Sequence, residues 1–161
     1  MAGDHYGDAT RVRTRGAADD HRDGSQGVSG MPPRLKLTAI TLDCADPEAL
    51  AAFYERATGW DPHPASDGEF AGLTGADGLF IGFQRVDDHR APTWPGAAVP
   101  QQAHLDFEVD DLDEAEALLL ELGASKPEQQ PGGDWWRVFA DPAGHPFCLT
   151  PASGDAQRRR R

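Results

Sequence analysis

The sequence predicts an α+β fold made of two tandem units, each with the order strand, helix, strands. Two observations lead to this prediction. The pattern of residues 36–86 returns at 102–151, about 65 residues later, and in each copy the apolar residues change from alternating to helical spacing. A unit of about 50 residues is marginal by itself because it buries too little surface. We therefore expect the two copies to pack together and to share one core.

The first unit begins with a half-buried strand, because residues 37–44 alternate between apolar and polar side chains. Asp46-Pro47-Glu48 then marks a helix N-terminus, with Asp as the N-cap and Pro at the first helical position. Apolar residues at helical spacing predict a helix over 49–57, which Gly59 ends. Two further strands are expected at 69–74 and 78–84.

The second unit repeats this order with a strand at 104–109 and a helix at 112–122, which follows Asp111 and ends at Gly123. Its last strands are expected at 135–140 and 146–150, around the turn Asp141-Pro-Ala-Gly. Trp135 and Trp136 are adjacent on one of these strands and should point to opposite faces, one beneath the helix and the other toward the cavity or the edge of the sheet. The acidic cluster at 110–116 is interpreted as a helix N-terminus and a solvated face.

Composition divides the chain into one folded domain and two tails. The domain is predicted over 34–152, with a stiff proline-containing linker at 87–101 between its two repeats. Residues 1–33 hold too few apolar side chains to offset the entropy of ordering, so we expect a disordered N-terminal tail, and Met31 is an alternative start. Residues 153–161 are expected to form an arginine-rich C-terminal tail.

The charge distribution argues against two classes of partner. Residues 34–154 hold seven basic and 21 acidic residues, a net charge of −14, so this part of the chain repels nucleic-acid phosphates and anionic membrane surfaces. Two cysteines, Cys44 and Cys148, do not make a disulfide framework. The sequence has neither a secretory signal nor a long apolar span, and we therefore expect a cytoplasmic protein.

Three runs of sequence resemble a known superfamily. Asp46-Pro47 with Phe53-Tyr54 and Gly59, and the later run from Asp141-Pro-Ala-Gly to Leu149, resemble the vicinal oxygen chelate superfamily of glyoxalase I, bleomycin-resistance proteins and extradiol dioxygenases. The run from Pro92 to Asp106 resembles a glyoxalase-like subgroup common in actinobacteria. The resemblance covers about 34–152. It implies two βαβββ modules whose curved, mixed sheets form a barrel-like cleft with the helices outside, and often a homodimer.

The resemblance also implies where a metal would bind, at Ala39, Gly82, His104 and Cys148. Alanine and glycine offer no ligand atom, so half of the set is missing. Asp106, Asp43 or Gln84 could help His104 and Cys148 to hold zinc, but donors on one strand are spaced about 6–7 Å apart. We therefore expect no metal and no other cofactor, and neither glyoxalase I activity nor extradiol ring cleavage.

The candidate site lies on the face of the second sheet that carries His104 and Asp106. His104 is a candidate acid or base, with Asp106 fixing its charge or binding a cation. Both can equally be explained as rim residues that hydrogen-bond the backbone. Apolar neighbours should raise the pKa of the Cys148 thiol, which favours packing over nucleophilic chemistry. The further ligand-binding candidates are Asp43, Cys148, Trp94 and Trp136.

Three functions remain open. The first, which we favour, is a bleomycin-resistance-like protein that binds a small planar or cationic molecule in its cleft without changing it. The second is a metal-independent lyase or isomerase that uses His104 and a nearby carboxylate as acid and base. The third is a structural module with a vestigial cleft. Turnover distinguishes the second from the others, and saturable binding distinguishes the first from the third.

Overall fold

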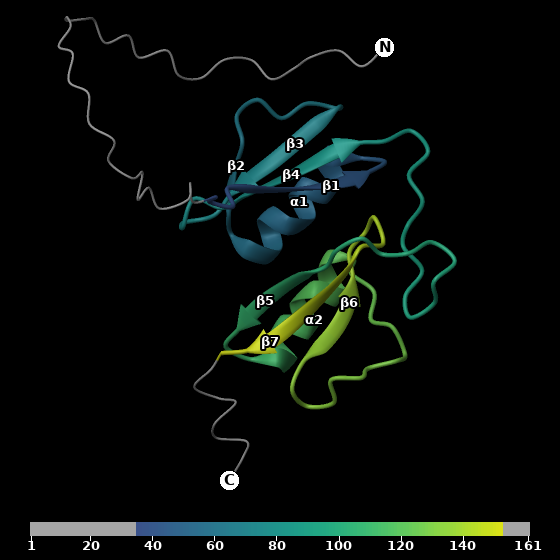
Figure 1. The fold of residues 1–161 in the computed structure, drawn as a ribbon. Coiled ribbons are helices and arrows are strands. Elements are labelled where there is room, and N and C mark those ends of the chain that lie inside the picture. The colour runs from purple at the N-terminus through teal and green to yellow at the C-terminus, as the bar shows by residue number, and fades with distance from the viewer. Residues whose placement is uncertain (1–34, 153–161) are drawn as a thin grey trace, which may run out of the picture. The chain divides into compact units, whose positions relative to one another are not determined.

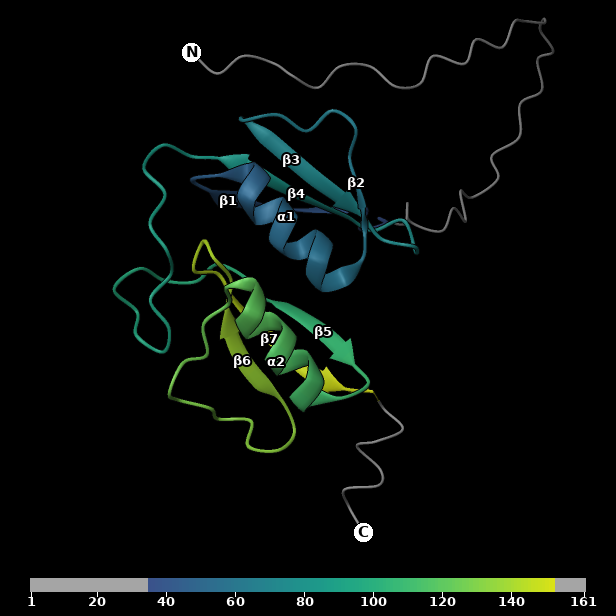
Figure 2. The same ribbon diagram turned by 180° about the vertical axis from the view of Figure 1, so that it is seen from behind.

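The computed structural model describes residues 35–152, and the tails expected at 1–33 and 153–161 lie outside the described residues. The described chain forms two similar modules, seen from opposite sides in Figures 1 and 2. Neither of its helices combines the length and the apolar character that a bilayer span requires. In chain order the elements are β1 (Ala39–Cys44), α1 (Pro47–Thr58), β2 (Asp61–Pro62), β3 (Phe70–Thr74), β4 (Phe80–Arg85), β5 (Leu105–Val109), α2 (Leu112–Leu122), β6 (Arg137–Ala140) and β7 (Pro146–Pro151).

The first module is a four-stranded mixed sheet with strand order β1-β4-β3-β2, in which β1 runs parallel to β4. Helix α1 packs on one face of it, against β3 and β4. The helix begins where the sequence predicts, because the Asp46 side chain accepts a hydrogen bond from the Ala49 backbone N–H at 3.0 Å. It ends at Gly59, whose φ of 68° lies in the left-handed region that glycine adopts without strain.

The second module is a three-stranded sheet with order β5-β7-β6, and β5 runs parallel to β7. Its fourth strand is reduced to one isolated bridge between Ser125 and Ala140. Trp135 and Trp136 lie just before β6 and not on it. The expectation that one of them packs beneath the helix is wrong, because Trp135 is 44% exposed and Trp136 lines a pocket away from the helix.

The helix-covered faces of both sheets contribute to one core, as the size of the repeats predicts. The ring of Tyr54 from α1 stacks on Phe83 of its own sheet, with centroids 5.4 Å apart and an interplanar angle of 12°. The same ring contacts Phe107 and Phe147 of the second sheet, with centroids 6.1 and 6.3 Å away. The inward-facing positions of each strand are therefore apolar, and the alternate positions form an open face on each sheet.

A buried carboxylate links the modules within this core. Asp141 follows β6 and is 4% exposed. Its side chain accepts hydrogen bonds from the Tyr54 hydroxyl and from the backbone N–H groups of Ala143 and His145, each at 2.9 Å. The His145 ring nitrogen Nδ1 lies 3.0 Å from Oδ2, the carboxylate oxygen that also accepts from the Tyr54 hydroxyl. A buried carboxylate with this many partners is stable, whereas the loss of a partner leaves it uncompensated.

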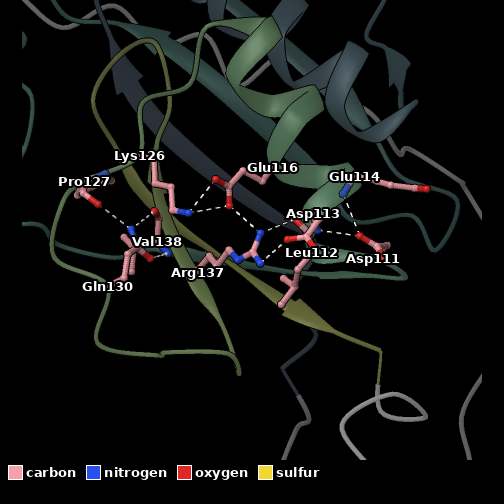
Figure 3. Close-up of polar contacts among 10 residues, drawn as sticks. All are labelled: Asp111, Leu112, Asp113, Glu114, Glu116, Lys126, Pro127, Gln130, Arg137 and Val138. Atoms are coloured by element: carbon pink, nitrogen blue, oxygen red, sulfur yellow. Dashed lines mark hydrogen bonds and ion pairs between the residues drawn. The ribbon is translucent and has the colours of Figure 1, made fainter. Parts of the chain in front are cut away.

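An ion-pair network attaches α2 to the last part of its sheet (Figure 3). Arg137 of β6 donates to the Glu116 carboxylate at 2.7 Å, to the Asp113 carboxylate at 2.6 Å and to the Leu112 carbonyl at 3.0 Å. Lys126 donates to the same Glu116 carboxylate at 2.7 Å. The acidic cluster thus caps α2 through Asp111, as predicted, but Glu116 joins the helix to β6 and is not simply solvated.

The Asp141–His145 pair should make stability depend on pH. Burial disfavours the charged imidazole, but the hydrogen bond to Asp141 and its charge outweigh this and raise the His145 pKa above its ordinary 6.5. The charged pair therefore stabilises the fold fully below pH 6.5 and loses this effect as the pH rises through the raised pKa. His145→Gln should lower the free energy of unfolding by about 1 to 3 kcal/mol at pH 5.5 and by less at pH 8.5, as measured by urea titration.

The control is to make His145→Gln in the Asp141→Asn variant and to compare the double variant with Asp141→Asn alone. Without the Asp141 carboxylate, the pH-dependent part of the effect should become much smaller, since only Asp43 then raises the His145 pKa. A loss of stability that grows between pH 5.5 and 8.5 would contradict the assignment of the charged pair.

Candidate functional site

Most of the residues singled out in the sequence meet on the open face of the second sheet. Leu105, Phe107 and Val109 of β5 face the core, so strand alternation turns His104 and Asp106 to the other side. There Asp106 pairs in register with Cys148 of β7, and Cys148 with Val138 of β6. A small pocket of about 90 Å³ opens at this place, which we call the second-sheet pocket. It is lined by Trp94, Gln101, His104, Trp136, Val138, Pro146 and Cys148.

The linker between the modules supplies one wall of this pocket. Thr93 and Val99 close a short loop, because the Thr93 N–H donates to the Val99 carbonyl at 2.8 Å and the Val99 N–H donates to the Thr93 hydroxyl at 2.9 Å. This loop carries Trp94, and Trp136 contributes a second indole from the segment before β6. The pocket thus has two aromatic walls that come from parts of the chain about 40 residues apart.

The polar groups of the site form a chain of contacts. The His104 Nε2 atom lies 3.6 Å from an Asp106 carboxylate oxygen, and the His104 Nδ1 atom lies 3.4 Å from the Gln101 side-chain nitrogen. Ligand atoms of His104, Asp106 and Cys148 all lie within 4.8 Å of one another. The expectation that donors on one strand stay 6–7 Å apart is therefore wrong for this strand, because the two side chains approach each other.

Gln101 lines the pocket but is not among the binding residues predicted from the sequence. Its Oε1 atom is buried and has no hydrogen-bond partner among the described residues. A buried acceptor without a partner is costly and is uncommon in folded proteins. The only available signal was its position in the run from Pro92 to Asp106 that carries the subgroup resemblance.

The Cys148 thiol is held in its neutral form. Burial raises its pKa to about 11, and the Asp106 carboxylate, which accepts a hydrogen bond from it, adds to the shift. Cys44 in the first sheet also has a pKa of about 11, because burial outweighs a backbone hydrogen bond that lowers it. Neither thiol is a nucleophile at neutral pH.

Asp43 is not part of this group. It lies on the open face of the first sheet, where its register partner is Gln84 of β4. Its backbone and its charge instead help to raise the pKa of His145. Of the six predicted binding residues, the structure brings together Trp94, His104, Asp106, Trp136 and Cys148.

The structure also shows whether the four metal-ligand positions implied by the resemblance could hold an ion. Ala39 offers no donor, and a side chain at Gly82 would not fit, since its Cβ would lie 2.8 Å from the ring of Phe70 and 3.0 Å from the Thr41 hydroxyl. The rings of Phe70 and Phe80 lie nearly parallel, 6.1 Å apart, over the glycines of this face. The four-ligand set therefore does not fit. The possible metal ligands that still lie close together are three side chains of the second sheet, His104, Asp106 and Cys148.

The two thiols provide an internal comparison for the role of Asp106. Replacement Asp106→Asn removes the charge that acts on Cys148 and does not act on Cys44. We expect iodoacetamide to alkylate Cys148 of the folded variant several-fold faster than in the wild type at pH 8, while alkylation of Cys44 stays equally slow. Peptide mass spectrometry of timed samples measures both rates. Equal acceleration at the two thiols would point to loosened packing and not to the carboxylate.

Known structures share this fold. A glyoxalase/bleomycin resistance protein/dioxygenase family enzyme from Burkholderia phytofirmans PsJN has a TM-score of 0.58 and 18% identity, with 73% of this chain and 98% of that chain covered. A possible glyoxalase from Bacillus cereus has a TM-score of 0.55 and 17% identity over 73% and 99% of the two chains. The fosfomycin resistance protein FosX from Listeria monocytogenes has a TM-score of 0.55 and 19% identity over 78% and 98%. At these identities the likeness establishes the fold.

Comparison with curated protein sequences gave no match. The glyoxalase-like domain family, in contrast, matches residues 39–150, which include every described strand and both helices except Pro151 at the end of β7. This match and the shared fold agree with the resemblance to the vicinal oxygen chelate superfamily. The chain therefore belongs to the glyoxalase-like domain family.

Proposed function

We propose that this protein binds a small planar molecule with a cationic or hydrogen-bond-donating group in the second-sheet pocket, without a metal. The observation that carries the proposal is the Gln101 side chain, which lines a pocket between two indoles and whose buried Oε1 atom has no hydrogen-bond partner in the described part of the chain. A ligand N–H group would satisfy this acceptor.

The charges around the pocket support a cation or a neutral donor over an anion. Asp106 adjoins the pocket beside His104 and Cys148, and its carboxylate is 59% exposed, so a ligand can reach it. Among the described residues, no lysine or arginine lines the pocket. Indole rings also attract cations through their negative faces. An anionic ligand would meet two acceptors and no fixed positive charge.

The size of the pocket limits what it can enclose. A volume of about 90 Å³ holds roughly three water molecules. It accommodates the polar end of a ligand or the edge of one ring, and the rest lies over the exposed His104 and Asp106. The small-molecule character of the proposal agrees with the names of the structural neighbours, two of which refer to resistance to bleomycin or fosfomycin. We further propose the actinobacterial glyoxalase-like subgroup, a homodimer and a cytoplasmic location.

One observation favours a second candidate, a metal-independent lyase or isomerase. His104 and Asp106 lie 3.6 Å apart on an accessible face, which is the arrangement of an acid–base histidine with an orienting carboxylate. This candidate requires that a bound ligand be converted. This candidate would be excluded if every compound that binds is recovered unchanged after prolonged incubation, both with the wild type and with His104→Ala.

Three isosteres test the charge preference. Benzamidine is a planar cation, benzamide is its neutral analogue and benzoate its anionic one. Titrations followed by the fluorescence of Trp94 and Trp136 should give an affinity that decreases from benzamidine to benzamide to benzoate. Asp106→Asn should weaken benzamidine binding by about three- to tenfold and leave benzamide binding little changed, because the carboxylate is partly screened by solvent.

Two controls belong to this experiment. Asp110→Asn makes the same change at an exposed position beyond the end of β5 and should leave all three affinities as they are. Gln101→Leu should weaken the binding of benzamidine and of benzamide, because both donate hydrogen bonds. Tighter binding of benzoate than of benzamidine would refute the proposed charge preference.

Elemental analysis tests the metal-free part of the proposal. Tag-free protein dialysed against metal-free buffer should contain zinc, iron, manganese and nickel far below one atom per chain, because the first-sheet positions offer no ligands. A content near one atom per chain that disappears in His104→Ala would show that His104, Asp106 and Cys148 hold a metal together. The benzamidine titration should then be repeated on metal-loaded protein.

A further inference from the structure

A larger cavity of about 340 Å³ lies on the other side of the second sheet, between helices α1 and α2 where the modules meet. We call it the helix-side cavity. Phe53, Tyr54 and Trp60 line it from the first module, and Phe107 and Leu119 from the second. No residue of the second-sheet pocket takes part in it.

Two of the polar side chains in its walls, those of Tyr54 and Thr58, are already engaged. The Tyr54 hydroxyl donates to the buried Asp141 carboxylate at 2.9 Å, so the residue presents its ring to the cavity. The Thr58 hydroxyl donates to the Tyr54 backbone carbonyl at 2.7 Å. Within residues 35–152, Glu108 is the one charged residue of the lining, and it is exposed. The cavity is therefore an aromatic and aliphatic space with an acidic rim.

Small side chains keep this space open. Ala57 of α1 and Ala115 of α2 both line the cavity, at the place where the two helices approach each other. A larger residue at either position would occupy it. Leu118 is 42% exposed at its edge, which leaves a path to solvent. An open, lined cavity of this kind differs from a packing defect, which is closed and has a volume of a few atoms.

We propose that the helix-side cavity is a second binding site, for an uncharged apolar molecule of two or three rings. An engineered apolar cavity of about 150 Å³ binds benzene, and this one is about twice that size. The volume lies at the lower end of small-molecule sites and is too small for a helix or strand of a partner protein. The acidic rim and the net charge of −14 over 34–154 exclude an anion.

This site is independent of the proposed function. It uses the helix-covered face of the second sheet, whereas Gln101 and Asp106 lie on its open face. A ligand held between α1 and α2 contacts both modules and stabilises their association, because it binds only the folded chain.

Two matched fluorescent probes test the proposal, N-phenyl-1-naphthylamine, which is uncharged, and 1-anilinonaphthalene-8-sulfonate, which has the same rings and a negative charge. The uncharged probe should bind saturably at one site per chain and raise the unfolding temperature. Ala115→Leu and Ala57→Leu should each weaken it by at least about tenfold. The sulfonate should bind at least about tenfold more weakly than the uncharged probe.

The chain provides matched controls on the same helices. Ala117 of α2 and Ala52 of α1 are exposed and do not line the cavity, so Ala117→Leu and Ala52→Leu should bind the probe as the wild type does. Trp136→Ala should also leave its affinity unchanged, which separates this site from the second-sheet pocket. Circular dichroism confirms that each variant is folded.

The proposal would be overturned by the absence of saturable binding to the wild type, by wild-type affinity in both folded cavity-filling variants, or by equal affinity for the two probes. Loss of binding in Ala117→Leu as well as in Ala115→Leu would also overturn it, because the effect would then follow a general change in the helix.

Discussion

The hydrogen bond between the Tyr54 hydroxyl and the Asp141 carboxylate lies at the centre of the structure. Each module buries only one face of a small sheet, so neither has a sufficient core without the other. Tyr54 fills the space between them with a ring that contacts both sheets, and its hydroxyl gives the buried Asp141 one of its partners. Because a buried carboxylate tolerates few other arrangements, this contact fixes how the two modules meet.

The alternation of strand β5 then separates two kinds of chemistry. Its inward side chains join the common core and line an apolar cavity, while His104 and Asp106 reach the opposite face. One sheet of three strands thus separates an aromatic space, with Glu108 at its rim, from a pocket beside the polar side chains of Gln101, His104 and Asp106. The two sites are close in the fold but share no side chain, and for this reason ligands of different character can occupy them.

Local signals predicted most of the fold. Asp46 and Gly59 bound α1 as the capping rules require, and alternation put His104 and Asp106 on one face. The position of Cys148 beside them came only from the family resemblance. Asp141 was predicted only as a turn residue, because its partner Tyr54 is 87 residues away and such a contact has no periodic signature. Gln101 was missed for the same reason: its burial depends on how the linker folds over the sheet, which composition does not show.

The two repeats have the same order of elements, but the candidate site lies on the second sheet only. The glycines of the first sheet explain this difference. At Gly72 and Gly82 the absence of a Cβ lets the rings of Phe80 and Phe70 lie flat on the open face. A face covered in this way has no room for a metal-binding side chain at position 82, whichever residue is placed there, unless a ring moves. The donors that lie within reach of one another, His104, Asp106 and Cys148, therefore belong to the second sheet, where Cys148 occupies the position equivalent to Gly82. A planar ligand with a donor group suits that half-site, because it needs acceptors and aromatic walls and no complete set of metal ligands.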